Sequence, residues 1–301
     1  MDFSLLLDPS ILLELLAQGL VRGSMYALMA VGLSLIFGIL NVVNFAHGEL
    51  FMIGAYVMYF VVASLGFPIL AGIAAAAVVL FVVGMLIERV LIDPLRRRSG
   101  RGWLLDAFVL TIGLTVVFQN LATELVGSRR QGLVEMIPGS LDIMGISLSY
   151  DRLVILAATL VVGAGVWLFV RYTPLGKAIR ATGQDAEAAR ALGISVRQIY
   201  MITFGIGASL AGISGALLIT IFPAYPTVGM LPAMKSFAVV VLGGLGNLPG
   251  AIVGGFLLGI IEAFAVFFLA AGWQHVLTAA LVVLVLVIRP QGLFAVQGAR
   301  P

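Results

Sequence analysis

The sequence predicts an all-α integral membrane protein, a polytopic bundle of about eight to nine transmembrane helices with broken helices and one short polar cytoplasmic helix. Of its 301 residues, 61% are hydrophobic and only 10% are charged, and the mean hydropathy is +1.16, whereas a soluble domain is about 25% charged. The 36 glycines indicate close helix contacts and interrupted helices, because disorder requires a far more polar chain. We expect residues 1–301 to form a single transmembrane domain.

The apolar stretches give the span count. A helix crosses a bilayer with about 20 apolar residues, and eight stretches of the chain meet or approach that length. A shorter apolar piece at 234–247 is a possible ninth crossing. The eight predicted spans are residues 12–38, 46–65, 68–92, 105–127, 151–171, 200–222, 250–271 and 274–289.

Two basic loops orient the bundle. Together they hold nine of the 17 lysines and arginines: Arg96, Arg97, Arg98 and Arg101 in the first loop, and Arg171, Lys177, Arg180, Arg190 and Arg197 in the second. Cytoplasmic loops carry such an excess, so both are predicted to be cytoplasmic and residues 127–151 to lie outside. Counting 234–247 as a crossing places the C-terminus inside and the N-terminus outside. These loops account for the net charge of +3 without a nucleic-acid partner.

Two stretches interrupt the apolar sequence with polar and helix-breaking residues. They read NVVNFAHGE at 41–49 and GGLGNLPG at 243–250. Interrupted segments in corresponding places of two halves indicate a transport site between repeats, and the sequences around the two stretches are weakly similar. Ordinary surface turns are the alternative. The candidate residues of a translocation path are Asn41, Asn44, Phe45, His47, Glu49, Lys235, Gly243, Gly244 and Asn247.

The stretch GQDAEAARALGIS at 183–195 predicts a short capped helix inside the second basic loop. Asp185 is a good N-cap, and Glu187 is attracted by the positive N-terminal end of the helix. Gly193 suits the left-handed C′ position that ends a helix. A helix of about two turns is marginal in isolation, so we expect packing on the membrane helices and on a cytoplasmic partner to stabilise it.

The spacing Glu187-Ala188-Ala189 followed by Gly193 resembles the EAA-xxx-G signature of ABC importer permeases. Four stretches, at 19–56, 173–194, 235–262 and 289–294 (RPQGLF), look like the LivH-type permeases of branched-chain amino acid ABC transporters. The similarity covers nearly the whole chain in order and is weakest at 127–151. In such permeases the short cytoplasmic helix is a coupling helix that fits a groove on the ATPase.

The resemblance implies a multi-pass permease subunit of the bacterial inner membrane. Its expected partners are a LivM-like second permease, two cytoplasmic ATP-binding subunits and a periplasmic binding protein that delivers leucine, isoleucine or valine. Related permeases carry other amino acids, amides or urea. The chain has no GxxxxGK[ST] phosphate loop, so we expect no enzyme activity and no cofactor in it, and ATP to be used by the partners. The implied coupling residues are Asp185, Glu187, Ala188, Ala189, Arg190 and Gly193.

Two other classes of protein are considered. In an ion-coupled secondary transporter, Glu49, Glu262 and Lys235 would bind a coupling ion, but such a transporter has no use for a coupling helix. In a rhomboid-like serine protease, Ser214 of GISG would be the nucleophile and His275 its base. Ser214 lies in a continuous apolar helix, where Ala208 and Gly212 have the spacing of close helix packing. With two histidines and no cysteine, no metal site is expected.

Overall fold

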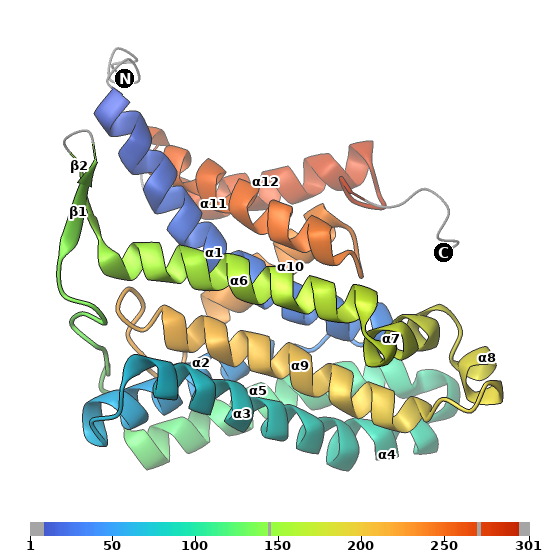
Figure 1. Ribbon diagram of the computed structural model, residues 1–301. Coiled ribbons are helices and arrows are strands. Elements are labelled where there is room, and N and C mark those ends of the chain that lie inside the picture. The colour runs from blue at the N-terminus through green and yellow to red at the C-terminus, as the bar shows by residue number, and fades with distance from the viewer. Residues whose placement is uncertain (1–8, 144–145, 270–271, 295–301) are drawn as a thin grey trace.

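The computed structural model describes residues 9–143, 146–269 and 272–294, and these residues are mostly helical (Figure 1). Seven helical segments are long and apolar enough to cross a membrane, and α10 and α12 are shorter apolar helices. These nine apolar helical segments of the described chain coincide with the eight predicted spans and the possible ninth at 234–247. The predicted fold class is confirmed. The helices are α1 (Pro9–Leu40), α2 (His47–Tyr59), α3 (Ile69–Ile87), α4 (Asp93–Arg98), α5 (Trp103–Val126), α6 (Tyr150–Tyr172), α7 (Pro174–Gln184), α8 (Ala186–Ala191), α9 (Val196–Leu217), α10 (Met230–Gly243), α11 (Leu248–Leu269) and α12 (Trp273–Ile288).

Short irregular elements complete the described chain. A π-helical turn extends α2 (Phe60–Ser64), a second joins α3 to α4 (Glu88–Ile92), and a 3₁₀ turn (Gly100–Gly102) precedes α5. Strands β1 (Ser140–Ile143) and β2 (Ile146–Ser149) form an antiparallel hairpin. The hairpin lies at one end of the bundle, and α4, α7 and α8 lie at the other (Figure 1).

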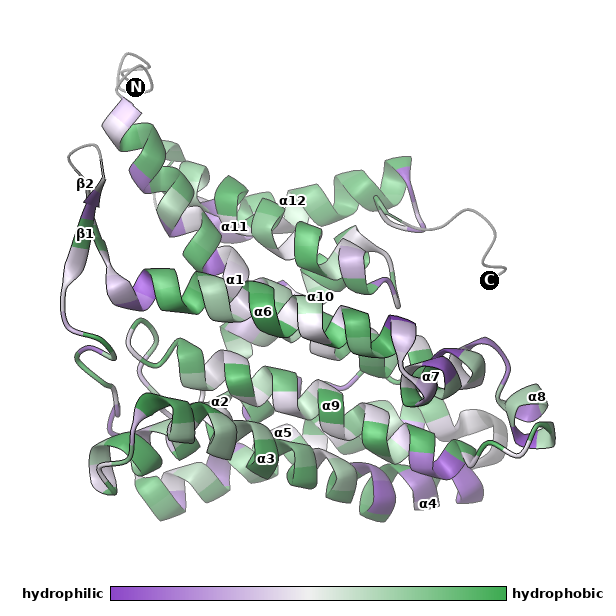
Figure 2. Ribbon diagram, in the orientation of Figure 1, coloured by the Kyte–Doolittle hydropathy of each residue, from purple (hydrophilic) through white to green (hydrophobic). Residues whose placement is uncertain are grey.

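The end that carries α4, α7 and α8 is also the more hydrophilic one (Figure 2). The two basic loops meet there, since the Arg197 guanidinium at the start of α9 lies 3.0 Å from the Asp93 carboxylate of α4. Asp93 also accepts a hydrogen bond of 3.1 Å from Arg97. Both basic loops therefore lie on one side of the membrane, as the positive-inside rule requires.

Burial separates central from peripheral helices. The most apolar window of α1 is 83% buried and that of α9 is 67% buried, whereas the windows of α3 and α6 are 22% buried and that of α5 is 11% buried. The exposed faces of α3, α5 and α6 are apolar (Figure 2), as expected for surfaces against lipid or another membrane subunit. The core of the bundle is thus built around α1 and α9.

Glycine allows the closest of these helix contacts. Gly19 and Gly23 of α1 lie against the backbone of α11 at Gly259 and Gly255. In α9, Gly212 packs on Leu80 of α3 and touches the backbone of α2. The predicted close packing of small residues in α9 is confirmed. Helix packing therefore explains Gly212 of the GISG stretch without a catalytic role.

The helices form two halves with inverted topology. In the first half α2 packs on α3, and in the second α10 packs on α11. Across the halves, α1 packs on α11 and α10, as α9 packs on α3 and α2. Gly32 of α1 lies against Gly207 of α9, while the carbonyl group of Met25 lies against Ser214. The two central helices therefore run antiparallel, so α1 to α3 and α9 to α11 are equivalent units in opposite orientations.

Candidate functional site

The helix α8 has the caps that the sequence predicts. The Asp185 side chain accepts hydrogen bonds of 2.9 Å from the backbone N–H groups of Glu187 and Ala188. Gly193 has φ +85°, its N–H donates to the Arg190 carbonyl group, and the next N–H donates to that of Ala189. This pair of hydrogen bonds is the Schellman arrangement. The caps are confirmed, and the helix between them has six residues.

The surface of α8 is exposed at the hydrophilic end of the bundle. Ala189 is buried, while Glu187, Ala188 and Arg190 are exposed. Leu192, which directly follows the helix, is 81% exposed. Single exposed apolar residues are common on protein surfaces, so Leu192 marks a candidate contact only together with the capped helix beside it. The sequence pattern did not single out Leu192, because an apolar residue near a membrane helix is unremarkable in this composition.

Helix α7 connects α8 to the core and was not predicted. The Thr173 hydroxyl accepts a hydrogen bond of 3.0 Å from the Gly176 N–H and caps α7 at its N-terminus, with Pro174 in the first turn, where proline is favoured. Its buried residues include Ile179 and Thr182, and Gly183 lies against the C-terminal end of α1. Helix α7 thus contacts both α8 and the central helix α1.

The first interrupted stretch re-enters the bundle. Asn41 has φ +54°, and a ring nitrogen of His47, Nε2, lies 3.1 Å from the carbonyl oxygen of Met29. Met29 precedes Leu40, the end of α1, by 11 residues, which is about 16 Å of helix. Residues 41–46 therefore run back beside α1, and α2 begins deep in the bundle. The alternative of a surface turn is wrong for this stretch.

A second re-entrant connection meets the first. Residues 218–229 join α9 to α10, and Gly229 at the start of α10 lies in backbone contact with Gly48 at the start of α2. In the inverted halves, 218–229 is thus the counterpart of 41–46. The predicted equivalence of 41–49 and 243–250 is wrong, because the hydrophobic pattern does not distinguish a re-entrant connection from a long apolar helix.

Three buried polar side chains, here called the polar cluster, lie within residues 44–49 where α2 begins: Asn44, His47 and Glu49. Asn44 accepts a hydrogen bond of 3.1 Å from the Ala46 N–H, and the Glu49 carboxylate accepts one of 2.9 Å from Gln119 of α5. One atom of each side chain has no partner in the described residues: Nδ2 of Asn44, Nδ1 of His47 and Oε2 of Glu49. Buried polar atoms are normally paired, so the cluster has unused hydrogen-bonding capacity.

An aromatic group adjoins this cluster. The ring of Phe45 lies 4.8 Å from that of Phe108 in α5, edge to face, and 5.1 Å from that of Phe237 in α10, stacked. The re-entrant segment thus places apolar rings from three parts of the chain beside the polar cluster. The sequence singles out Phe45 but not its two partners, which are distant in the chain.

Lys235 is engaged in an intramembrane ion pair. Its ammonium group lies 2.5 Å from the Glu262 carboxylate of α11 and 2.7 Å from the Thr278 hydroxyl of α12. The Tyr26 hydroxyl of α1 donates a hydrogen bond of 2.7 Å to the same carboxylate. The network joins α1, α10, α11 and α12 and neutralises Lys235, which favours a role in packing over direct contact with cargo.

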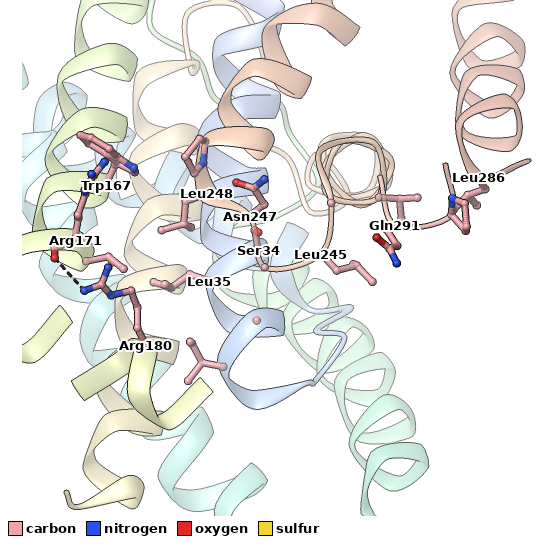
Figure 3. A pocket seen from close by; sticks show the side chains of 18 residues that line it. Ser34, Leu35, Trp167, Arg171, Arg180, Leu245, Asn247, Leu248, Leu286 and Gln291 are labelled. Carbon is pink, nitrogen blue, oxygen red and sulfur yellow. Dashed lines mark hydrogen bonds between the residues drawn. The ribbon is translucent and has the colours of Figure 1, made fainter. Parts of the chain in front are cut away.

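The second interrupted stretch is a turn beside a cavity of about 950 Å³ (Figure 3). Gly244 and Asn247 line the cavity together with Trp167, Arg171 and Arg180. Gly243 instead packs against Gly250 across the turn. Asn247 bonds to the backbone of Gly250 and of the segment after α12. For this stretch the surface-turn alternative holds, and its glycines serve the turn, since Gly244 and Gly246 have positive φ.

The geometry does not form a protease site. Ser214 is fully buried, and its hydroxyl group points to the Met25 carbonyl oxygen at 3.4 Å. His275 contacts Gln274 beside it. Of the hydrogen bonds in the described residues, none joins Ser214 to His275. A serine nucleophile needs a base within hydrogen-bond reach and an open approach, and Ser214 has neither.

Inverted halves, re-entrant segments that meet inside the bundle, and a capped helix at the hydrophilic end together define a membrane transport protein. Residues 15–286 match the family described as branched-chain amino acid transport system / permease component. The chain belongs to this family of transport permeases, which confirms the resemblance seen in the sequence. It is therefore a multi-pass integral protein of the inner membrane.

Curated relatives support the same assignment. The chain is 34% identical to the high-affinity branched-chain amino acid transport system permease protein LivH of Salmonella typhimurium, over 93% of this chain and 94% of LivH. It is 35% identical to the permease protein BraD of Pseudomonas aeruginosa, over 93% of this chain and 95% of BraD. It is 30% identical to the autoinducer 2 import system permease protein LsrC of Yersinia pestis, over 71% of this chain and 60% of LsrC. No solved structure matches the chain significantly.

Proposed function

We propose that this chain is the membrane-spanning subunit of an ATP-driven importer for branched-chain or related apolar amino acids. Support comes from the permease family and from near full-length similarity to LivH and BraD, which are named for branched-chain amino acid transport. The weaker similarity to LsrC, named for import of autoinducer 2, is consistent with a scaffold that serves several small polar cargoes.

The single observation that carries the proposal is the capped helix α8. In our proposal residues 183–195 form the coupling helix, and Asp185, Glu187, Ala188, Ala189, Arg190 and Gly193 give it its caps and its docking surface. Closure of two cytoplasmic ATP-binding subunits would push α8, and α7 would pass the movement to α1. Since α1 carries the re-entrant segment at its end, the same movement would open the path beside it.

The remaining partners follow from the same proposal. A LivM-like second permease would pack on this chain within the membrane, and a periplasmic amino-acid-binding protein would dock on the hairpin end. The chain itself needs no cofactor in this scheme, because ATP is bound and hydrolysed by the partners. Substrate selection then belongs mainly to the binding protein, and the permease needs only brief contacts with its cargo.

Reconstitution of the complete complex tests the proposal. The chain would be co-expressed with its second permease and two ATP-binding subunits, purified, and placed in proteoliposomes with the binding protein. We expect ATP-dependent uptake of labelled leucine that unlabelled isoleucine and valine reduce and urea does not. A complex whose ATP-binding subunits lack the phosphate-loop lysine is the control. Failure of the subunits to copurify, or uptake that this control retains, would contradict the proposal.

A further inference from the structure

Glu49 is a buried carboxylate without a cationic partner in the described part of the chain. Only 1% of the residue is exposed. Its Oε1 accepts a hydrogen bond from the neutral Gln119 amide, and its Oε2 has no partner among the described residues. A carboxylate deep in a membrane bundle is unfavourable unless a positive charge or several donors compensate it.

A second fully buried carboxylate, Glu262, shows what compensation looks like. Glu262 binds the Lys235 ammonium group and accepts hydrogen bonds from the Tyr26 and Thr278 hydroxyl groups. Both of its oxygens are used. Glu49, by contrast, has one carboxylate oxygen without a partner among the described residues, so it can still accept a hydrogen bond.

Two features around Glu49 suit a small polar ligand. Glu49 is the third residue of α2, and α10 begins beside it at Gly229, so the positive ends of two helix dipoles point toward this region. Nδ2 of Asn44, five residues earlier in the chain, has no hydrogen-bond partner among the described residues. Asn44 and Glu49 thus offer an unused donor and an unused acceptor on one short stretch, the two kinds of group that bind a zwitterion.

The apolar part of a ligand would also find a surface here. The rings of Phe108 and Phe237 both contact that of Phe45, which directly follows Asn44 in the chain. An aliphatic side chain gains free energy by packing on such rings, and a cation near their faces is attracted by them. An apolar amino acid needs these three features together: an acceptor for its ammonium group, a donor for its carboxylate and an apolar wall.

We infer that Glu49 contacts the α-ammonium group of an amino acid as it passes the junction of α2 and α10. This inference rests on the proposed function and names a residue within it that contacts the cargo. In the closed arrangement described here Glu49 is sealed, and movement of residues 41–46 and 218–229 would uncover it. The contact is brief because one carboxylate and one amide hold the cargo only weakly.

Three variants of the complete complex test the inference by ATP-driven leucine uptake in proteoliposomes. Glu49→Gln keeps the shape and a hydrogen bond to Gln119 but removes the charge. Gln119→Leu removes the hydrogen bond and keeps the charge. The exchange Glu49→Gln with Gln119→Glu returns a carboxylate to the same junction from the neighbouring helix.

We expect Glu49→Gln to lower uptake about tenfold or more, as loss of a buried charge contact does, with assembly and basal ATP hydrolysis unchanged. Leucine uptake by Gln119→Leu should stay within about threefold of wild type. The exchange variant should recover much of the uptake that Glu49→Gln loses. It also tests the inference if Glu49→Gln alone assembles poorly. Equal loss in Glu49→Gln and Gln119→Leu, or an assembled exchange variant without uptake, would overturn the inference.

Other outcomes separate this inference from the proposed function. If the Glu49→Gln complex imports leucine as fast as the wild-type complex, only the role of Glu49 is overturned and the proposed function stands. A wild-type complex that imports no amino acid overturns both. Proton movement that accompanies leucine uptake and is lost in Glu49→Gln, followed with a pH-sensitive dye inside the vesicles, would assign the carboxylate to a proton and also overturn the inference.

Discussion

Gly48 and Gly229 lie in reciprocal backbone contact, each against the carbonyl oxygen of the other. They stand at the starts of α2 and α10, which are equivalent helices of the two inverted halves. A Cβ atom on either glycine would overlap the partner's backbone. This contact therefore fixes both re-entrant segments relative to each other, next to the polar cluster of Asn44, His47 and Glu49.

Substitution of either glycine by alanine should destabilise the bundle. Because backbone atoms cannot yield as a flexible side chain does, Gly48→Ala and Gly229→Ala should each cost about 1–3 kcal/mol through overpacking. Thermal unfolding of the purified chain in detergent measures the effect. Gly113→Ala in α5 is the matched control, since nothing lies within 4 Å of its added Cβ, and it should be neutral or slightly stabilising. Equal stability of all three variants would contradict the contact.

The Lys235–Glu262 pair should behave as a structural unit. Removing one partner, in Lys235→Met or Glu262→Met, leaves a buried group uncompensated and should cost about 3–5 kcal/mol. The double variant Lys235→Met with Glu262→Met should recover most of this loss. A double-mutant cycle on thermal stability measures the coupling. If both single variants are as stable as wild type but inactive, Lys235 belongs instead to the translocation path.

The C-terminal cap of α8 should affect coupling without affecting membrane insertion. Gly193 has φ +85° and open space around its added Cβ, so substitutions there act through the backbone alone. The left-handed backbone conformation costs a non-glycine residue roughly 1–2 kcal/mol, and β-branched residues adopt it least readily. Gly193→Val should therefore reduce substrate-stimulated ATP hydrolysis more than Gly193→Ala.

A docking contact at Leu192 would be sensitive to charge. Leu192→Glu should weaken copurification of the ATP-binding subunits while the chain remains in the membrane at a normal level, because a charged side chain cannot be buried in an apolar groove without a partner. Normal copurification and transport by both Leu192→Glu and Gly193→Val would show that α8 is only a connector.

The orientation of the bundle is open to a labelling test. The chain has no native cysteine, so single cysteines report their own side of the membrane. A cysteine at Gln184, between α7 and α8, should resist an impermeant thiol reagent applied outside intact cells, while one at Gly132 should react. Both positions are solvent-exposed in the bundle. Reaction at Gln184 from outside would reverse the orientation and remove α8 from the cytoplasm.

The sequence predicted what depends on composition and local chemistry. Span positions follow from apolar length, and the caps of α8 follow from Asp185 and Gly193. Local sequence patterns cannot predict the contacts of Gln119 with Glu49, or those of Thr278 and Tyr26 with Glu262. These contacts join residues far apart in the chain. The re-entrant segment 218–229 was missed for a different reason: its residues are apolar enough to read as the end of a span.

The energy source is the central point of the account, and transport by the chain alone tests it most directly. Proteoliposomes that contain only this chain would be given an inward proton or sodium gradient and, separately, ATP. We expect neither condition to drive uphill leucine uptake, whereas the complete complex with its binding protein accumulates leucine when ATP is supplied to its ATP-binding subunits. Uphill uptake by the chain alone under either ion gradient would contradict the account and identify a secondary transporter.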